Sequence, residues 1–106
     1  MADGPVYRPL GVFKYTCDAT TAKALSSPDS GTAPPTGAAR CTLSCETNSA
    51  RYRDDGTAPT SSSGVPLIKD MPAVPYEGDL SALKLIGQSA NSIVWVAFYS
   101  QSRQGA

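Results

Sequence analysis

The chain has 106 residues, with nine Lys or Arg, nine Asp or Glu and no histidine. Its length suits one small domain with a single modest core. The balanced charge gives no general attraction to nucleic acid or to an anionic membrane surface. The lack of histidine excludes Ser–His–Asp and Cys–His catalysis and most zinc sites. We therefore expect a protein that is not an enzyme, has no cofactor and binds neither nucleic acid nor a membrane.

Small polar residues dominate the composition, because Ser, Thr, Gly and Pro fill 40 positions and charged residues make up 17% of the chain. This mixture is typical of short strands joined by turns and long loops, and it argues against a helical bundle. The start, Met1–Pro5, has no basic patch or long apolar run, so we expect synthesis in the cytoplasm without a signal peptide.

The first half of the chain begins with an apolar segment at 6–17 that is interrupted by Pro9 and Gly11. It predicts a strand with an irregular start at the edge of a sheet, because interior strands tolerate proline poorly. Residues 18–25 fit either one helical turn or a short strand. Residues 26–39 predict a long surface loop with Asp29 as its single charge, either mobile or an arm that orders on a neighbouring subunit.

The second half contains five further candidate strands, at 40–46, 50–54, 65–69, 80–86 and 92–100. Pro72 and Pro75 break the segment between the third and the fourth of these. The last one is apolar on both faces, which predicts a central buried strand. The whole chain, 1–106, is expected to form one all-β domain, an antiparallel β-sandwich or jelly-roll-like barrel of six or seven strands with long loops. Its ends, 1–5 and 102–106, are expected to be flexible.

Three cysteines, Cys17, Cys41 and Cys45, fall within or at the end of predicted strands. On a strand over 40–46, the second and third lie about 13 Å apart on one face, which is too far for a mutual disulfide. They are interpreted as buried free thiols. A disulfide between Cys17 and one of the other two, or between molecules, stays open as the alternative.

The densest charged feature is the cluster of Arg51, Arg53, Asp54 and Asp55 at the end of a predicted strand. Tyr52 is expected on the opposite face from the two arginines. The cluster lacks a base or metal set for catalysis, the alternating acids of an EF-hand, and enough cations for nucleic acid. It is interpreted either as local Arg–Asp pairing or as an interface in which an arginine binds a carboxylate of a neighbouring subunit.

From this cluster onward the chain resembles a pattern in small virion proteins of tailed bacteriophages. The matching stretches are RYRDDGTAPT (Arg51–Thr60), SSSGVPL ending at Leu67, PYEGDLSAL (Pro75–Leu83) and the apolar strand Ile93–Tyr99. The resemblance covers roughly residues 40–101. Residues 1–39 and the cysteines lie outside the matching pattern.

The resemblance implies a structural component of the phage particle, either a capsid decoration or cement protein or a head–tail accessory protein, without distinguishing the two. We expect the first, a protein that stabilises the head by binding between capsid subunits. The expected partners are the major capsid protein or other virion proteins, with assembly into a dimer or trimer and localisation in the virion. Interface candidates are Arg51, Arg53, Asp54, Asp55 and Tyr76. A head–tail, tail or fibre-associated accessory protein is the first alternative.

A carbohydrate- or receptor-binding β-sandwich is the second alternative. It requires several exposed aromatic side chains on one face, whereas Trp95, Phe98 and Tyr99 are expected to pack in the core and at its edge.

Overall fold

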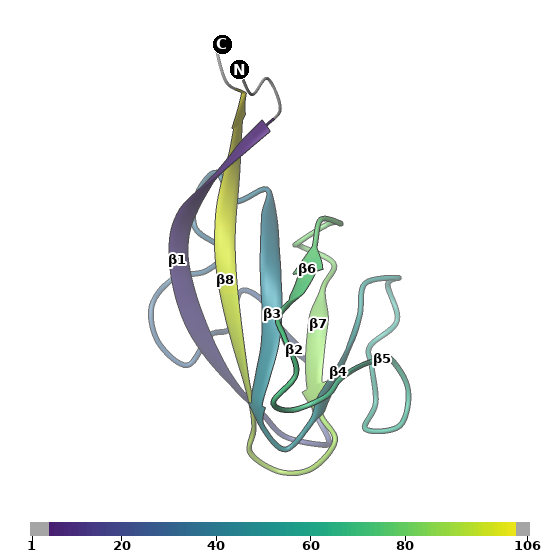
Figure 1. The fold of residues 1–106 in the computed structure, drawn as a ribbon. Coiled ribbons are helices and arrows are strands. Elements are labelled where there is room, and N and C mark those ends of the chain that lie inside the picture. The colour runs from purple at the N-terminus through teal and green to yellow at the C-terminus, as the bar shows by residue number, and fades with distance from the viewer. Residues whose placement is uncertain (1–4, 104–106) are drawn as a thin grey trace.

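The computed structural model describes residues 5–103, and every regular element in this range is a β-strand (Figure 1). The strands are β1 (Pro5–Cys17), β2 (Lys23–Ala24), β3 (Arg40–Thr47), β4 (Ala50–Arg53), β5 (Val65–Leu67), β6 (Val74–Tyr76), β7 (Lys84–Gly87) and β8 (Ser92–Arg103). The described residues contain no helix long and apolar enough to cross a membrane. Of the ends expected to be flexible, residues 1–4 and 104–106 lie outside the described residues, whereas Pro5, Ser102 and Arg103 belong to the paired strands β1 and β8.

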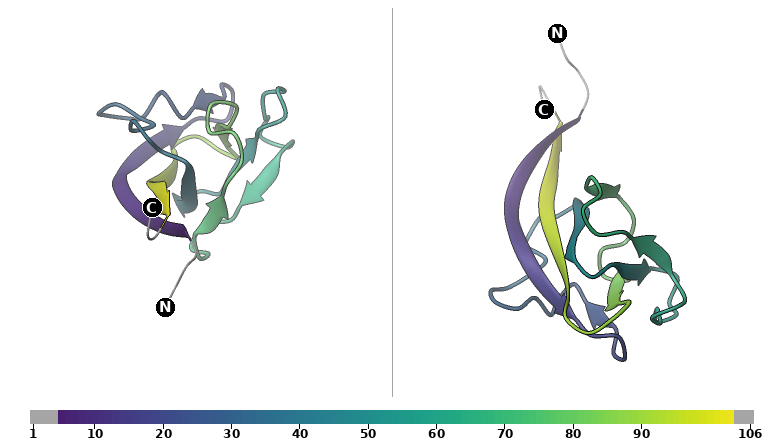
Figure 2. Two further views of the ribbon diagram at one scale, coloured as in Figure 1. Left: turned by 90° about the horizontal axis from the view of Figure 1, so that it is seen from above. Right: turned by 60° about the horizontal axis from the view of Figure 1, so that its bottom comes forward.

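Two four-stranded antiparallel sheets make up the fold, with strand orders β1-β8-β3-β6 and β2-β7-β4-β5. The all-β fold expected from the sequence is confirmed, and the two sheets are consistent with the β-sandwich form. The fold has eight strands instead of the expected six or seven. The long strands β1 and β8 lie side by side and curve together along the first sheet (Figure 2).

The strand β8 occupies the interior of its sheet, between β1 and β3, as its apolar sequence predicts. Val94, Val96 and Phe98 alternate along it and are fully buried against the other sheet. The opposite face of β8 was also expected to be buried, but Trp95 on that face points away from the core and is partly exposed. The strand is therefore central, but it is buried on one face only.

The strand β1 is an edge strand, as Pro9 predicts, and its register with β8 shifts between Pro9 and Gly11. Gly11 has a φ of 156°, and a Cβ there would lie 3.2 Å from the ring of Phe13. The irregular start is thus a β-bulge at which a residue without a side chain leaves room for an aromatic ring.

Two of the eight strands were not expected as definite strands. The ambiguous segment 18–25 contains only the two-residue strand β2, and the proline-broken segment contains β6. Pro75 is tolerated within β6 because that strand lies at the edge of its sheet.

The strand expected at 80–86 begins only at Lys84. Residues before it form a turn, because the Asp79 carboxylate accepts hydrogen bonds from the backbone N–H and the hydroxyl of Ser81. The backbone N–H of Ala82 also donates to the carbonyl of Asp79. This aspartate-capped turn outcompetes extension of the strand.

The core lies between the inner faces of the two sheets. Its buried members are Tyr15, Cys17, Leu25, Ala33, Cys41, Leu43, Cys45, Ala50, Leu67, Tyr76, Leu83, Leu85, Val94, Val96 and Phe98. Phe13 packs edge-on against Phe98, with ring centroids 5.7 Å apart. Every strand except β2 contributes to this cluster or packs on it, so the sheets form one cooperative unit.

The segment 26–39 lies against its own chain. Ala33 is buried in the core, and a Cβ on Gly31 would lie 3.0 Å from the ring of Phe13. The backbone N–H of Asp29 donates to the carbonyl of Lys14 at 2.9 Å. This loop therefore covers the outer edge of β1.

Candidate interaction surface

The two arginines of the charged cluster lie on the outer face of β4, and Tyr52 lies on the opposite face as expected, where it packs on the core. Arg51 donates to the carbonyls of Gly64 at 2.9 Å and Ser61 at 3.2 Å. Arg53 donates to the Ser63 hydroxyl at 3.1 Å. Both guanidinium groups thus fix the loop that follows β4.

Arg53 also binds Asp55 through two nitrogens, with a distance of 3.0 Å from Nε to Oδ1. These hydrogen bonds from the guanidinium lower the pKa of Asp55 to about 2. The local Arg–Asp pairing considered from the sequence is therefore present, and it uses donors that an intersubunit contact would need.

Tyr76 connects the cluster to the core. Its hydroxyl donates to Asp54 Oδ2 at 2.5 Å and lies 3.3 Å from the carbonyl of Asp79. Its ring packs edge-on against Tyr52, with centroids 6.0 Å apart. Burial, and then the hydrogen bond to Asp54, raise the pKa of the Tyr76 phenol. The buried ring and occupied hydroxyl position Asp54 rather than present Tyr76 to a partner.

All three cysteines are free and buried. Cys41 and Cys45 lie on the inner face of β3, as their spacing predicts. Burial raises the pKa of the Cys17 and Cys41 thiols to about 11 and also raises that of Cys45. The thiols therefore stay protonated and unreactive at neutral pH.

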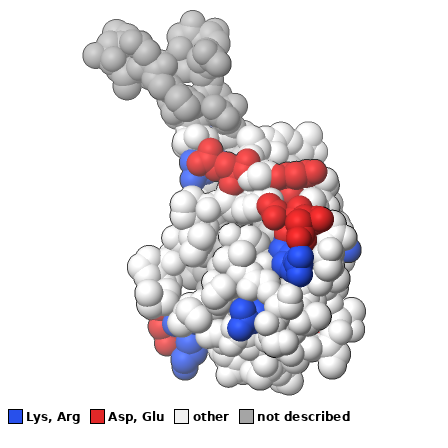
Figure 3. Space-filling view, turned by 90° about the vertical axis from the view of Figure 1, so that its right-hand side faces the viewer, with Lys and Arg blue, Asp and Glu red and all other residues white. Residues whose placement is uncertain are grey.

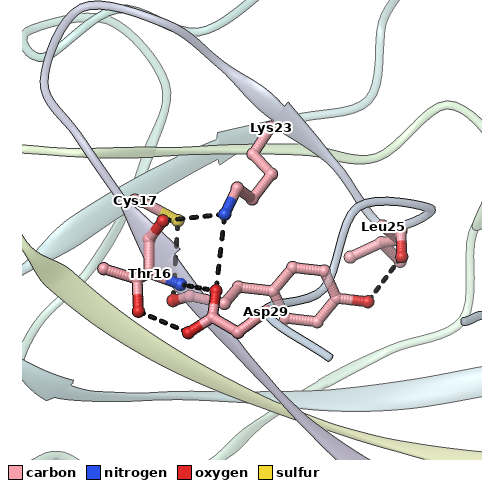
Figure 4. Close-up of polar contacts among 6 residues, drawn as sticks. Thr16, Cys17, Lys23, Leu25 and Asp29 are labelled. Atoms are coloured by element: carbon pink, nitrogen blue, oxygen red, sulfur yellow. Dashed lines mark hydrogen bonds and ion pairs between the residues drawn. The ribbon is translucent and has the colours of Figure 1, made fainter. Parts of the chain in front are cut away.

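Asp29 closes the free edge of β1, a role that its sequence position alone did not indicate. Its carboxylate accepts hydrogen bonds from the backbone N–H of Thr16 at 2.8 Å and from the Thr16 hydroxyl (Figure 4). Lys23 Nζ donates to the Thr16 carbonyl at 2.9 Å and lies 3.5 Å from Asp29. The side chains thus satisfy backbone groups that would otherwise invite another strand.

The opposite side of the sandwich is open, because β5 and β6 are the last strands of their sheets. Four large apolar side chains there are 38% to 58% exposed, and we name them the apolar strip: Val65, Ile68, Met71 and Val74. Figure 3 shows a mostly uncharged face with scattered Lys and Arg side chains, and most of its acidic side chains lie toward one end. Sequence reasoning missed the strip because its residues fall in predicted strands and proline-broken turns.

Backbone contacts hold the strip in place. The N–H of Lys69 donates to Ser49 Oγ at 3.1 Å, and the N–H of Asp70 donates to the carbonyl of Cys45 at 3.0 Å. Leu67 and Tyr76, which flank the crossing between the sheets, are both buried. The exposed side chains are therefore presented on an anchored backbone, which lowers the entropic cost of binding.

Within residues 5–103, no cluster of three or more His, Cys, Asp or Glu side chains is arranged to hold a metal ion. Comparisons with protein-family models, curated proteins and solved structures give no match to this chain.

Proposed function

We propose that this chain is a bacteriophage virion structural protein, a capsid decoration or cement protein that stabilises the head by binding between capsid subunits. The proposal is supported by the resemblance of Arg51–Leu67, Pro75–Leu83 and Ile93–Tyr99 to small virion proteins of tailed phages. The observation that carries it is the apolar strip on the open side of the sandwich. Several exposed large apolar side chains beside free sheet edges favour a protein that works by adhering to another protein.

Prolines in both edge strands favour docking by side chains over strand addition. Pro66 lies at the centre of β5 and Pro75 at the centre of β6, and each strand has only three residues. A proline cannot donate a backbone hydrogen bond, so neither edge easily templates a further strand. Such a surface suits a protein that covers a shell in many copies without polymerising into fibres.

The zero net charge of the chain and its small binding surface are compatible with a protein that binds in many copies to a symmetric capsid. One weak contact per copy becomes effective when it is repeated over a symmetric shell and supplemented by contacts between copies. We therefore include in the proposal assembly into a dimer or trimer, which would bury apolar surface left open by one thin sandwich. Sedimentation that shows a stable monomer without affinity for capsids would contradict this part of the proposal.

The direct test is co-sedimentation of the purified chain with particles that lack it. We expect Ile68→Asp and Met71→Asp each to weaken binding by at least about tenfold, because each places a charge in a desolvated contact. Thr32→Asp is the matched control, since it adds the same charge at an exposed position of the loop that covers the opposite sheet edge. Equal binding by all three variants would reject the strip as the contact.

A head–tail, tail or fibre-associated accessory protein is the competing assignment within the particle. The apolar strip is compatible with either location, since both need adhesion to another virion protein. The two assignments differ in the number of copies that each particle contains.

A further inference from the structure

The outer face of the β1-β8-β3-β6 sheet is a second open surface, distinct from the apolar strip. In the register of this sheet, Arg40 lies opposite Tyr99, and Thr42 lies opposite Ala97. Val12, on the same row as Ala97, is 62% exposed, and Trp95 is also exposed on this face. Among the described side chains, Lys14 and Glu46 also lie on this face, and Glu77 lies beside Arg40.

A groove of about 250 Å³ lies on this face and is lined by Tyr7, Arg40, Thr42 and Tyr99. The guanidinium carbon of Arg40 is 4.2 Å from the centroid of the Tyr7 ring. One cation thus lies among three residues that carry hydroxyl groups. The volume fits a single side chain rather than a larger ligand.

The Arg40 side chain is only 17% exposed. For a guanidinium group that is so largely buried, it has few hydrogen-bond and carboxylate partners. Its Nε is buried and has no hydrogen-bond partner among the described residues. Its Nη1 lies 3.5 Å from Glu77 Oε2, but that carboxylate is 62% exposed and forms a loose contact. Buried polar groups are normally hydrogen-bonded, and guanidinium groups usually bind carboxylates through two parallel hydrogen bonds.

We propose that this groove binds the carboxylate of one Asp or Glu side chain of a partner protein, with Arg40 as the anchor. A carboxylate supplies the planar pair of acceptors that the guanidinium lacks. Arginine, tyrosine and tryptophan are also the residues that dominate binding energy at protein interfaces, and all three are present on this face. Arg40 is the one cation among the residues that line the groove in the described part of the chain, which is too little for nucleic acid.

The choice of a protein side chain over a free carboxylate rests on the surroundings of the groove. A small acid would gain only the polar contact, whereas a partner surface would also cover Val12 and Trp95. The proposal does not depend on the virion role, because it concerns a different face and any partner with a protruding carboxylate.

The test follows the Arg40 Nε–H signal of the intact protein by NMR, which burial protects from exchange. The probe is a blocked peptide whose apolar flanks can cover Val12 and Trp95, Leu-Ser-Glu-Ser-Leu, with the Gln peptide as its matched control at equal ionic strength. We expect saturable shifts of Arg40 and of the amides of Tyr7 and Tyr99 with the Glu peptide, with a dissociation constant on the order of millimolar. The Gln peptide should give no saturation.

Four other outcomes would overturn the proposal. Shifts that follow ionic strength alone, or no shift, would remove the site. Sodium acetate that saturates the site as tightly as the peptide would assign it to small free acids. Shifts that depend on protein concentration without peptide would assign the face to a second copy of the chain.

Variants give an independent check. Arg40→Lys keeps the charge but loses the planar fork, so affinity for the Glu peptide should fall at least about tenfold, as it should in Arg40→Gln. Lys14→Gln removes a cation from the same outer face and should leave affinity within about twofold. Equal affinity in Arg40→Lys and the unaltered chain would contradict the role of the guanidinium. If an Arg40 variant fails to fold, the titration of the unaltered chain still decides the question.

Discussion

Asp29 binds Thr16 through both of its carboxylate oxygens, one to the backbone N–H and one to the hydroxyl. This pair closes one side of the sandwich, while the side formed by β5 and β6 stays open. Of these two lateral sides of the sandwich, the open one presents the apolar strip to a partner.

Removal of the Asp29 carboxylate is expected to destabilise the fold and expose an edge strand. Asp29→Ala should lower the free energy of unfolding by about 1–2 kcal/mol, because a backbone donor loses a charged acceptor. It should also increase aggregation through β1. Urea denaturation and light scattering check both effects. Ser30→Ala, an exposed neighbour in the same loop, is the control and should change neither.

The Arg53–Asp55 pair should make a small acid-sensitive contribution to stability. The folded pKa of Asp55, about 2, lies below its ordinary value because Arg53 binds the ionised form. The contribution is therefore fully present above about pH 4 and is lost as the pH falls toward 2. Arg53→Gln should return the pKa of Asp55 toward its ordinary value in an NMR titration of the carboxyl carbons. An unchanged pKa would show that Arg53 is not the cause.

The three thiols are expected to be inaccessible in the folded protein. Cys17 and Cys41, with pKa values raised to about 11 by burial, should react with a thiol reagent only after unfolding. In denaturant, three thiols per chain should react at once. Rapid labelling without denaturant, or a disulfide-linked dimer on a non-reducing gel, would contradict the buried free state.

The hydroxyl of Tyr15 should contribute substantially to the free energy of unfolding. It is buried and donates to the carbonyl of Leu25 at 2.5 Å, which ties the segment after β2 to the core. Tyr15→Phe leaves that carbonyl without its partner and should cost about 1–3 kcal/mol of unfolding free energy. Thermal or urea unfolding measures the loss, and a cost below a few tenths would mean that water replaces the hydroxyl.

The sequence predicted most of the strands because alternating or continuous apolar residues leave few alternatives. The apolar segment at Ser92–Ser100 predicted a central strand, and Pro9 predicted an edge. The sequence did not predict that β7 begins only at Lys84, because the turn capped by Asp79 depends on a local hydrogen bond that competes with extension of the strand.

The candidate surface was less predictable. The composition of 26–39 indicated a loop but not that Asp29 and Gly31 would pack on β1, because that contact is fixed by tertiary structure. Likewise, Ile68 and Met71 form an exposed strip only because β5 and β6 take the open edges of their sheets. The buried position of Tyr76 also follows from that arrangement and has no local signal.

The number of copies of this chain in purified particles, measured against the major capsid protein by quantitative mass spectrometry, tests the proposed function most directly. A decoration protein should be present on the order of hundreds of copies, in a fixed ratio to the capsid protein, because it follows the symmetry of the shell. A count of about a dozen would place the protein at the neck or tail, as expected for a ring-shaped adaptor. Absence from the particle would contradict the virion role altogether.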